Sequence, residues 1–182
     1  MKMKHYLLIT TLFMATLLSC SKSDDPVTPD TTNLLLRKWT FSEVSVKTDA
    51  KTYKIPADGA TFFGEDNTVT FNKDNTYSTV EAGKTVNAGT WKLSNSNKTL
   101  TLTDIDKITT DMTVNTLTST NIELATASVS MAKANPSPEE LNIAFVAGFL
   151  LYSTDKAYGG TVDFTKEPEP KSLQVLLKGK AL

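Results

Sequence analysis

Histidine and cysteine are almost absent from this chain of 182 residues, which contains one of each. The histidine is His5 and the cysteine is Cys20, so no histidine or cysteine follows position 20. The remainder of the chain therefore cannot hold an internal disulfide, a zinc site of cysteine and histidine, or a catalytic pair of serine or cysteine with histidine.

An excess of positive charge is also missing. The chain has 19 Lys and Arg against 20 Asp and Glu, a formal net charge of −1, which argues against a nucleic-acid binder. Charged residues make up 21% of the chain and hydrophobic residues 40%, as in an ordinary globular domain. The length allows a single domain with a sizeable core.

The first apolar run is too short to span a membrane. Residues 6–18 are uncharged and follow Lys2 and Lys4, whereas a membrane-spanning helix needs about 20 apolar residues. A cationic start followed by a short apolar run is typical of a secretory signal. We therefore expect residues 1–19 to be a signal peptide.

The signal ends in Leu17-Leu18-Ser19-Cys20, which resembles the lipobox of bacterial lipoproteins. Leu17 and Ser19 are of the usual types, and Leu18 is tolerated. The resemblance implies that Cys20 becomes the first mature residue and carries acyl chains such as palmitate. Two or more chains, with roughly 0.8 kcal/mol for each buried methylene, would anchor the protein to a membrane. The alternative is a plain signal peptide that happens to end in Ser-Cys.

Residues 20–33 are expected to be a lipidated cysteine and a flexible tether, because they are polar and contain two prolines. Asp24 and Asp25 resemble the acidic export signal that sends lipoproteins of the Bacteroidota to the outer face of the outer membrane. The alternative is a solvated linker on a protein that faces the periplasm.

Residues 34–182 have the pattern of an all-β, mainly antiparallel domain. Short alternating apolar runs, many threonines and frequent turn residues predict a sandwich or barrel of about eight to ten strands. Trp39 and Phe41 alternate, as do Val44 and Val46, and the change of phase between them predicts a β-bulge or bend at residues 42–43. A brief helical turn or an extended lead-in is expected at residues 34–36.

Turn residues separate the expected strands. Asn75 is placed to take a left-handed conformation in the turn after Val69–Phe71, before the strand that starts at Tyr77. Gly159-Gly160 is interpreted as a hairpin turn, and residues 56–59 as a loop. The other expected strands cover residues 91–93, 100–102, 108–117, 122–131, 162–164 and 175–177.

One segment departs from the strand pattern. Residues 137–140, Ser-Pro-Glu-Glu, form a capping box with proline at the first helical position. Residues 141–152 follow and are apolar on every side, which predicts a buried helix in an insert at about 137–153. A buried strand is the alternative, since Gly148 weakens a helix. The helix could belong to the core, cover a ligand cavity, or contact a partner or a membrane.

Three motifs resemble the lipocalin-like domains of many Bacteroidota lipoproteins. Residues 36–39 are similar to their Leu-x-x-Trp opening, residues 69–77 to their strand-turn-strand signature, and residues 89–102 to the next hairpin. The resemblance covers roughly residues 34–124. Arg37 and Asn75 stand where glycine is common, and the insert is not part of the pattern. The resemblance implies a small antiparallel barrel whose interior holds a small apolar ligand, with the signature tryptophan closing one end.

Candidate chemistry is sparse. Asp104 and Asp106 would lie on one face of a strand, with Asp111 nearby, but the glycine and bidentate glutamate of a calcium loop are absent. A solvated strand edge or turn, a weak cation site and a catalytic pair are the three interpretations. Glu65-Asp66 fits a loop, and Glu139-Glu140 fits a helix start. Trp39 and Trp91 are expected in the core rather than as a sugar-stacking platform.

These observations predict no metal site, no cofactor and no catalytic residues, and hence a protein that is not an enzyme. The leading hypothesis is a lipid-anchored protein of the cell outer membrane, exposed at the surface, whose barrel binds a small apolar molecule. One alternative is an interaction subunit of an envelope complex with a self-filled barrel. Another is a glycan-binding accessory protein with Tyr53, Phe62, Phe63 or Tyr158 in an exposed row.

Overall fold

The structure, a computed structural model, describes residues 31–55, 67–81 and 83–182. Its helices are α1 (Thr31–Leu35) and α2 (Pro138–Tyr152), with short 3-10 helices η1 (Lys156–Tyr158) and η2 (Phe164–Lys166). Its strands are β1 (Lys38–Thr48), β2 (Thr52–Ile55), β3 (Thr68–Phe71), β4 (Thr76–Glu81), β5 (Lys84–Ser94), β6 (Thr99–Asp104), β7 (Thr109–Leu117), β8 (Asn121–Thr126), β9 (Val129–Ser130) and β10 (Ser172–Ala181). None of the helices in these ranges is long and apolar enough to cross a membrane.

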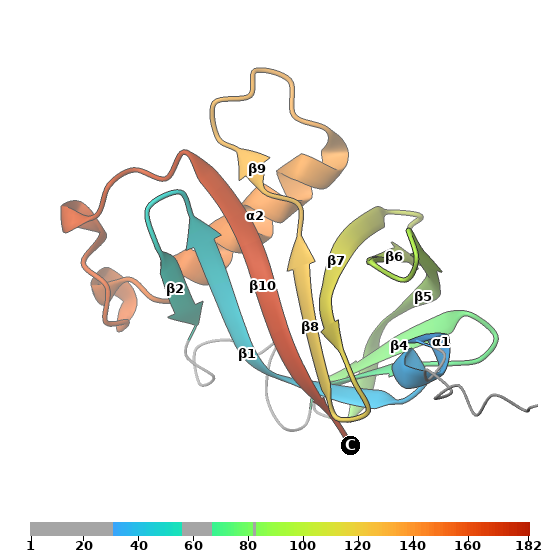
Figure 1. Ribbon diagram of the computed structural model, residues 1–182. Coiled ribbons are helices and arrows are strands. Elements are labelled where there is room, and N and C mark those ends of the chain that lie inside the picture. Colours follow the sequence, from blue (N-terminus) through green and yellow to red (C-terminus); the bar gives the residue numbers. More distant parts are fainter. Residues whose placement is uncertain (1–30, 56–66, 82) are drawn as a thin grey trace, which may run out of the picture.

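Eight strands close into an antiparallel barrel (Figure 1). The order is β1-β3-β4-β5-β6-β7-β8-β10, and β10 pairs with β1 to complete the ring. Strands β2 and β9 extend the sheet beside β1 and β10. The all-β, lipocalin-like prediction is confirmed.

A β-bulge keeps one face of β1 turned inward along its whole length. The register with β10 shifts between Phe41 and Glu43, where the sequence predicted the bulge. Trp39 and Phe41 are buried before the shift, and Val44 and Val46 are buried after it. Without the extra residue, the period of two would turn the second pair to the outside.

The predicted turns that depend on local sequence alone are confirmed. Asn75 has φ 63° in the turn between β3 and β4, and its backbone N–H donates to the Asn72 carbonyl. Residues 95–97 also have positive φ between β5 and β6. The short helical turn before Trp39 is present as α1.

Two predictions for the segment after α2, a strand and a hairpin turn, are wrong. Val162 forms only an isolated parallel bridge with Asp155, and Phe164 begins η2. Gly159 ends η1 at φ 90° instead of joining two strands. A Cβ on Gly160 would lie 2.0 Å from the Thr154 carbonyl oxygen, so the backbone approaches Thr154 closely at this glycine. The strand expected over 122–131 is split into β8 and β9.

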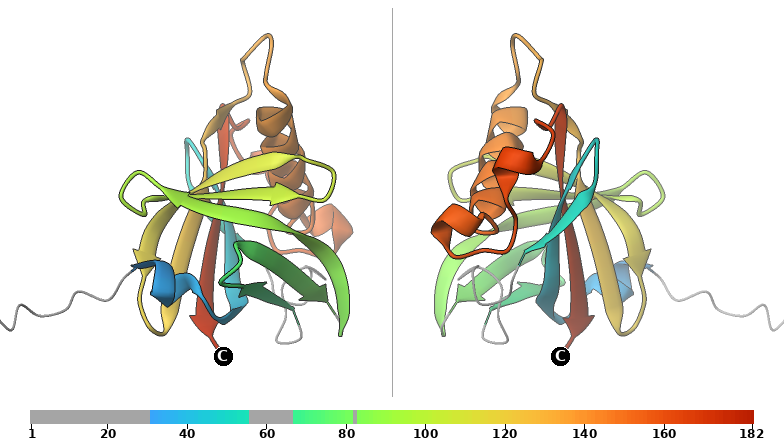
Figure 2. Two further views of the ribbon diagram at one scale, coloured as in Figure 1. Left: turned by 90° about the vertical axis from the view of Figure 1, so that its right-hand side faces the viewer. Right: turned by 90° about the vertical axis from the view of Figure 1, so that its left-hand side faces the viewer.

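The buried apolar side chains form two clusters. The closed end contains Leu35, Trp39, Phe41, Phe71, Tyr77, Trp91, Leu100, Ile122 and Leu124. The helix end contains Val44, Val46, Tyr53, Ile55, Val129, Ile143, Ala147, Leu150, Leu151, Leu173 and Val175. Leu177 of β10 packs against both clusters. The inner face of β1 and β10 therefore supports two cores, one after the other along the strands. Figure 2 shows α2 beside β10 at the helix end.

Candidate functional site

A cavity of about 340 Å³ lies between the barrel wall and α2. Leu102, Met112 and Leu177 line it from the barrel, and Ile143, Val146 and Leu150 line it from the helix. Its volume falls in the range of small-molecule sites, which are mostly apolar with a few polar groups. The sequence did not reveal this cavity, because it depends on where α2 comes to rest.

A second chamber of about 120 Å³ adjoins the cavity inside the barrel. The two spaces share Leu102, Met112 and Leu177, and residues of the closed end such as Phe41 and Phe71 line the chamber farther in. Thr68 borders the chamber, but the alternation of β3 turns its side chain to the face opposite Val69 and Phe71.

Helix α2 is placed over the cavity by its first turn. The backbone N–H of Glu140 donates to Ser137 Oγ at 3.2 Å, and the Ser137 N–H donates to Glu140 Oε2 at 2.7 Å, which completes the predicted capping box. The backbone N–H of Asp111 on β7 donates to Glu139 Oε1 at 2.9 Å. This bond ties the start of the helix to the barrel wall beside the cavity.

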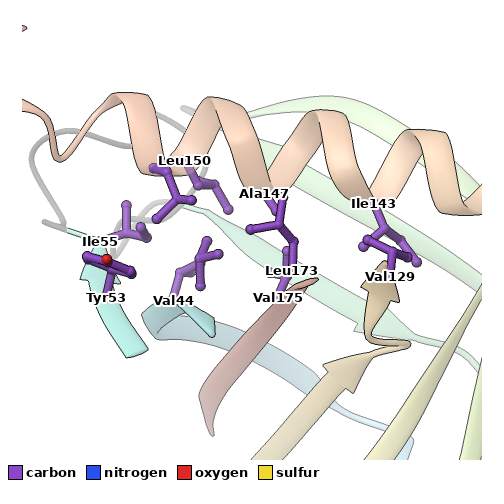
Figure 3. Packing of buried hydrophobic residues seen from close by; sticks show 11 residues of the cluster. Val44, Tyr53, Ile55, Val129, Ile143, Ala147, Leu150, Leu173 and Val175 are labelled. Carbon is purple, nitrogen blue, oxygen red and sulfur yellow. The ribbon is translucent and has the colours of Figure 1, made fainter. Parts of the chain in front are cut away.

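The inner face of α2 packs on the sheet. Figure 3 shows Ile143, Ala147 and Leu150 turned toward side chains of β1, β9 and β10, among them Val44 and Val175. Ile143 and Leu150 touch both this core and the cavity. The helix is therefore part of the core and a cover of the cavity at once.

The expectation that α2 is buried on every side is wrong. Leu141, Phe145 and Tyr152 are 56%, 74% and 49% exposed. The sheet lies on one side of the helix and can bury only the face turned toward it. Composition alone could not show this, because every face of the helix is apolar.

The pairing of β4, β5 and β6 brings three polar side chains to one side of the cavity: Tyr77, Asn87 and Asp104. The other polar residues that line the cavity are Thr110, Thr126 and Asn142. Asp104 is the one charged residue among those that line the cavity and chamber within the described ranges. Its Oδ1 accepts a hydrogen bond of 2.9 Å from the Ile108 N–H. Burial raises the pKa of the Tyr77 phenol, and the charge of Asp104 raises it further. The phenol therefore keeps its proton at neutral pH and can donate a hydrogen bond.

The acidic pair predicted on a strand face is placed differently. Strand β6 ends at Asp104, and Asp106 belongs to the exposed turn before β7. Asp111 lies on β7 and accepts a hydrogen bond from the Thr101 hydroxyl. Within the described residues, no three Asp, Glu, His or Cys side chains are grouped so that they could hold a metal ion. Only Asp104 of these residues reaches the cavity.

Both tryptophans belong to the core, as predicted. Trp39 is fully buried, and its Nε1 donates to the Leu35 carbonyl at 3.0 Å. Trp91 donates to the Asn72 carbonyl at 3.2 Å and meets Phe71 edge to face. Neither ring is available as a sugar-stacking platform.

The structure describes two members of the expected exposed aromatic row, Tyr53 and Tyr158, and Tyr53 is not exposed. Tyr53 is 5% exposed, and its hydroxyl donates to Glu167 Oε2 at 3.2 Å. Tyr158 is exposed but stacks on Tyr152 of α2, with the ring centroids 3.7 Å apart. The remaining candidate residues lie outside the described residues: Cys20, Asp24, Asp25, Phe62, Phe63, Glu65 and Asp66. The loop expected at 56–59 lies outside them as well.

Comparison with known proteins agrees with this architecture. Residues 35–124 match the family model described as a lipocalin-like domain, which extends from α1 into β8. No curated protein matches the chain. With the closed antiparallel barrel and the buried Trp39 that begins it, the match shows that the chain carries a lipocalin-like domain.

Proposed function

We propose that this protein binds a small apolar molecule non-covalently in its barrel and does not catalyse a reaction. The observation that carries the proposal is the apolar cavity that continues into the barrel as a second chamber. A lipocalin-like barrel is suited to this role, because an eight-stranded barrel can enclose one small ligand. Each Å² of apolar ligand surface buried there contributes roughly 25 cal/mol, before the cost of ordering the ligand.

Mass spectrometry of the protein purified from the envelope of its native host tests this proposal. We expect denaturation to release one small apolar molecule in a stoichiometric amount. The control is Leu102→Trp, which places a larger side chain at the junction of cavity and chamber and should release much less. A folded wild-type protein that releases nothing, and takes up no apolar probe, would contradict the proposal.

We further propose that the protein is a lipoprotein, held by acyl chains on Cys20 at the surface of the outer membrane. The support is in the sequence: the lone cysteine ends a signal-like apolar run, and Asp24 and Asp25 follow it. Cys20→Ala should move the protein from the membrane fraction to the soluble fraction. Protease treatment of intact cells should remove the domain, and protection of the domain until the outer membrane is opened would mean that it faces the periplasm.

A second candidate function is an interaction subunit that docks another envelope protein. The observation that favours it is the exposed apolar face of α2, with Leu141 and Phe145. Crosslinking on cells should then join the protein to a single partner, and Phe145→Asp should abolish that product without unfolding the domain. An unchanged crosslinking pattern in the variant would exclude this face as the docking site.

A further inference from the structure

The charges around the cavity have one sign. Asp104 lines the main cavity, and an adjoining surface pocket that shares Asn87 and Asp104 also contains Glu81 and Asp106. None of the three carboxylates forms a salt bridge in the described part of the chain, in contrast to Glu43, Glu140 and Glu167. The surface pocket beside the cavity is therefore lined by three carboxylates that have no salt-bridge partner among the described residues.

Two lysines lie near this pocket without forming a salt bridge to its carboxylates among the described residues. Lys84 is the register partner of Glu81 in the β4–β5 pair, and Lys107 follows Asp106 in the turn after β6. Neither lysine lines the cavity, the chamber or the adjoining pocket. A ligand carboxylate would consequently meet Asp104 without a cation to pair with, which is unfavourable in a partly desolvated site.

One oxygen of Asp104 remains for a ligand. Oδ1 accepts the Ile108 N–H, and Oδ2 has no hydrogen-bond donor among the described residues, so Oδ2 can accept from a charged donor. Tyr77 and Asn87 lie on the same cavity wall and add neutral groups that can each donate or accept a hydrogen bond. The polar side of the cavity thus offers one negative charge beside two neutral hydrogen-bonding groups.

The opposite end of the space is apolar. Phe41, Phe71 and Leu124 surround the chamber, and no charged side chain lines it within the described residues. A ligand that extended from Asp104 into the chamber would bury apolar surface there.

We propose that the ligand is an amphipathic cation: an apolar body in the cavity and chamber, with an amine or ammonium group beside Asp104. The proposal rests on the proposed function and names the class of ligand for the same site. Such a site would bind fatty acids and other apolar anions more weakly, although their apolar parts would fill the same space equally well. Attraction between the head group and the three carboxylates also predicts that binding weakens as salt is added.

Isothermal titration calorimetry with three probes of equal chain length tests this class. Decylamine, decanol and decanoate differ only in the head group and are used below the concentrations at which they aggregate. We expect decylamine to bind at least tenfold more tightly than decanol, and decanoate to bind most weakly. Asp104→Asn keeps an oxygen for the Ile108 N–H and should reduce the preference for the amine to about twofold or less, with little change for decanol.

Two control variants separate specific recognition from general attraction. Asp111→Asn removes the same charge from β7 outside the cavity and should leave the amine preference unchanged. Leu102→Trp should weaken both the amine and the alcohol. If decanoate binds as well as decylamine, or if Asp104→Asn retains the full preference, the inference is overturned while the proposed function stands. If none of the three probes binds the folded protein, both are overturned.

Discussion

The closed end and the helix end are two cores built on the same pair of strands, and they differ in how their apolar residues are covered. At the closed end, strands from around the barrel and α1 enclose Trp39, which is fully buried. At the helix end, α2 covers the sheet with one face and presents Phe145, 74% exposed, on another. Figure 1 shows both ends on β1 and β10.

The difference shows that an apolar sequence is buried only where the surrounding fold can enclose it. A barrel surrounds its interior on all sides, so alternation along each strand is enough to bury one face. Helix α2 packs on β10 and its neighbours and has a sheet on one side only. The helix end therefore combines a stable inner face, a cavity beneath it and an apolar outer face.

The largest effect is expected at the closed end. Trp39→Ala should lower the free energy of unfolding by about 3–5 kcal/mol, because it removes a fully buried side chain and one of the two donors to the Leu35 carbonyl. Phe145→Ala should change it by less than about 0.5 kcal/mol. Urea titration of both variants measures the two values, and similar losses would remove the distinction between the two ends.

Two neighbouring positions on α2 should respond in opposite directions. Ala147 is fully buried against the sheet, so Ala147→Leu should cost about 1–3 kcal/mol through overpacking. Gly148 has open space around the position of a Cβ, so Gly148→Ala should stabilise the protein by roughly 0.5–1 kcal/mol through helix propensity. Thermal unfolding of the pair is the measurement. A destabilising Gly148→Ala would show that this face of the helix is covered after all.

The capping box should matter for the helix end alone. Ser137→Ala removes the acceptor for the Glu140 N–H and should cost about 1 kcal/mol, whereas Ser137→Asp keeps an oxygen there and should cost little. Amide hydrogen exchange should show faster exchange within α2 and unchanged exchange at β5 and β6. Equal acceleration at the closed end would mean that the two cores open together.

The smallest of the expected effects concerns acid. Mild acid should destabilise the helix end before the closed end. A hydrogen bond from Lys133, assisted by the Ser137 N–H, lowers the pKa of Glu140 below its ordinary value of 4.5. Lys51 lowers the pKa of Glu167 in the same way at the other end of this region. A lowered pKa means that the stabilisation is present above about pH 4.5 and is lost as the pH falls through the folded-state value.

The two ends carry separate probes for this acid transition. Both tryptophans of the chain lie at the closed end, and α2 dominates the helical circular dichroism. Between about pH 5 and 3, the helical signal should fall before the tryptophan fluorescence changes. Glu140→Gln should reduce this acid sensitivity. Coincident transitions in the wild type would show that Glu140 and Glu167 make no separate contribution.

Local chemistry explains most of the successful predictions. Alternating apolar residues predicted the strands, the change of phase after Phe41 predicted the irregularity in β1, and Ser137 with Glu140 predicted the start of α2. Each of these signals is contained within a few residues. The failures at Val162 and Gly159 have a common cause: the segment that follows α2 is held by close contacts with Thr154 and Asp155, which no pattern in the segment itself records.

The candidate site was much less accessible to sequence reasoning. Asp104 was singled out as one of a pair on a strand face, but the end of β6 separates it from Asp106 and leaves it alone on the cavity wall. Leu102, Met112 and Leu177 look like ordinary core residues in the sequence. They line the cavity because strands β6, β7 and β10, distant along the chain, face the same space.

The sequence by itself determined an all-β antiparallel domain, the change of phase in β1, the core position of both tryptophans and the capping box that begins α2, because these follow from side-chain period, turn chemistry and capping. Only the tertiary structure decided which face of α2 is buried, that a cavity remains beneath it, and that Asp104 is the charge on its wall. These properties depend on how a helix that is apolar on every side settles on a sheet that can cover only one of them.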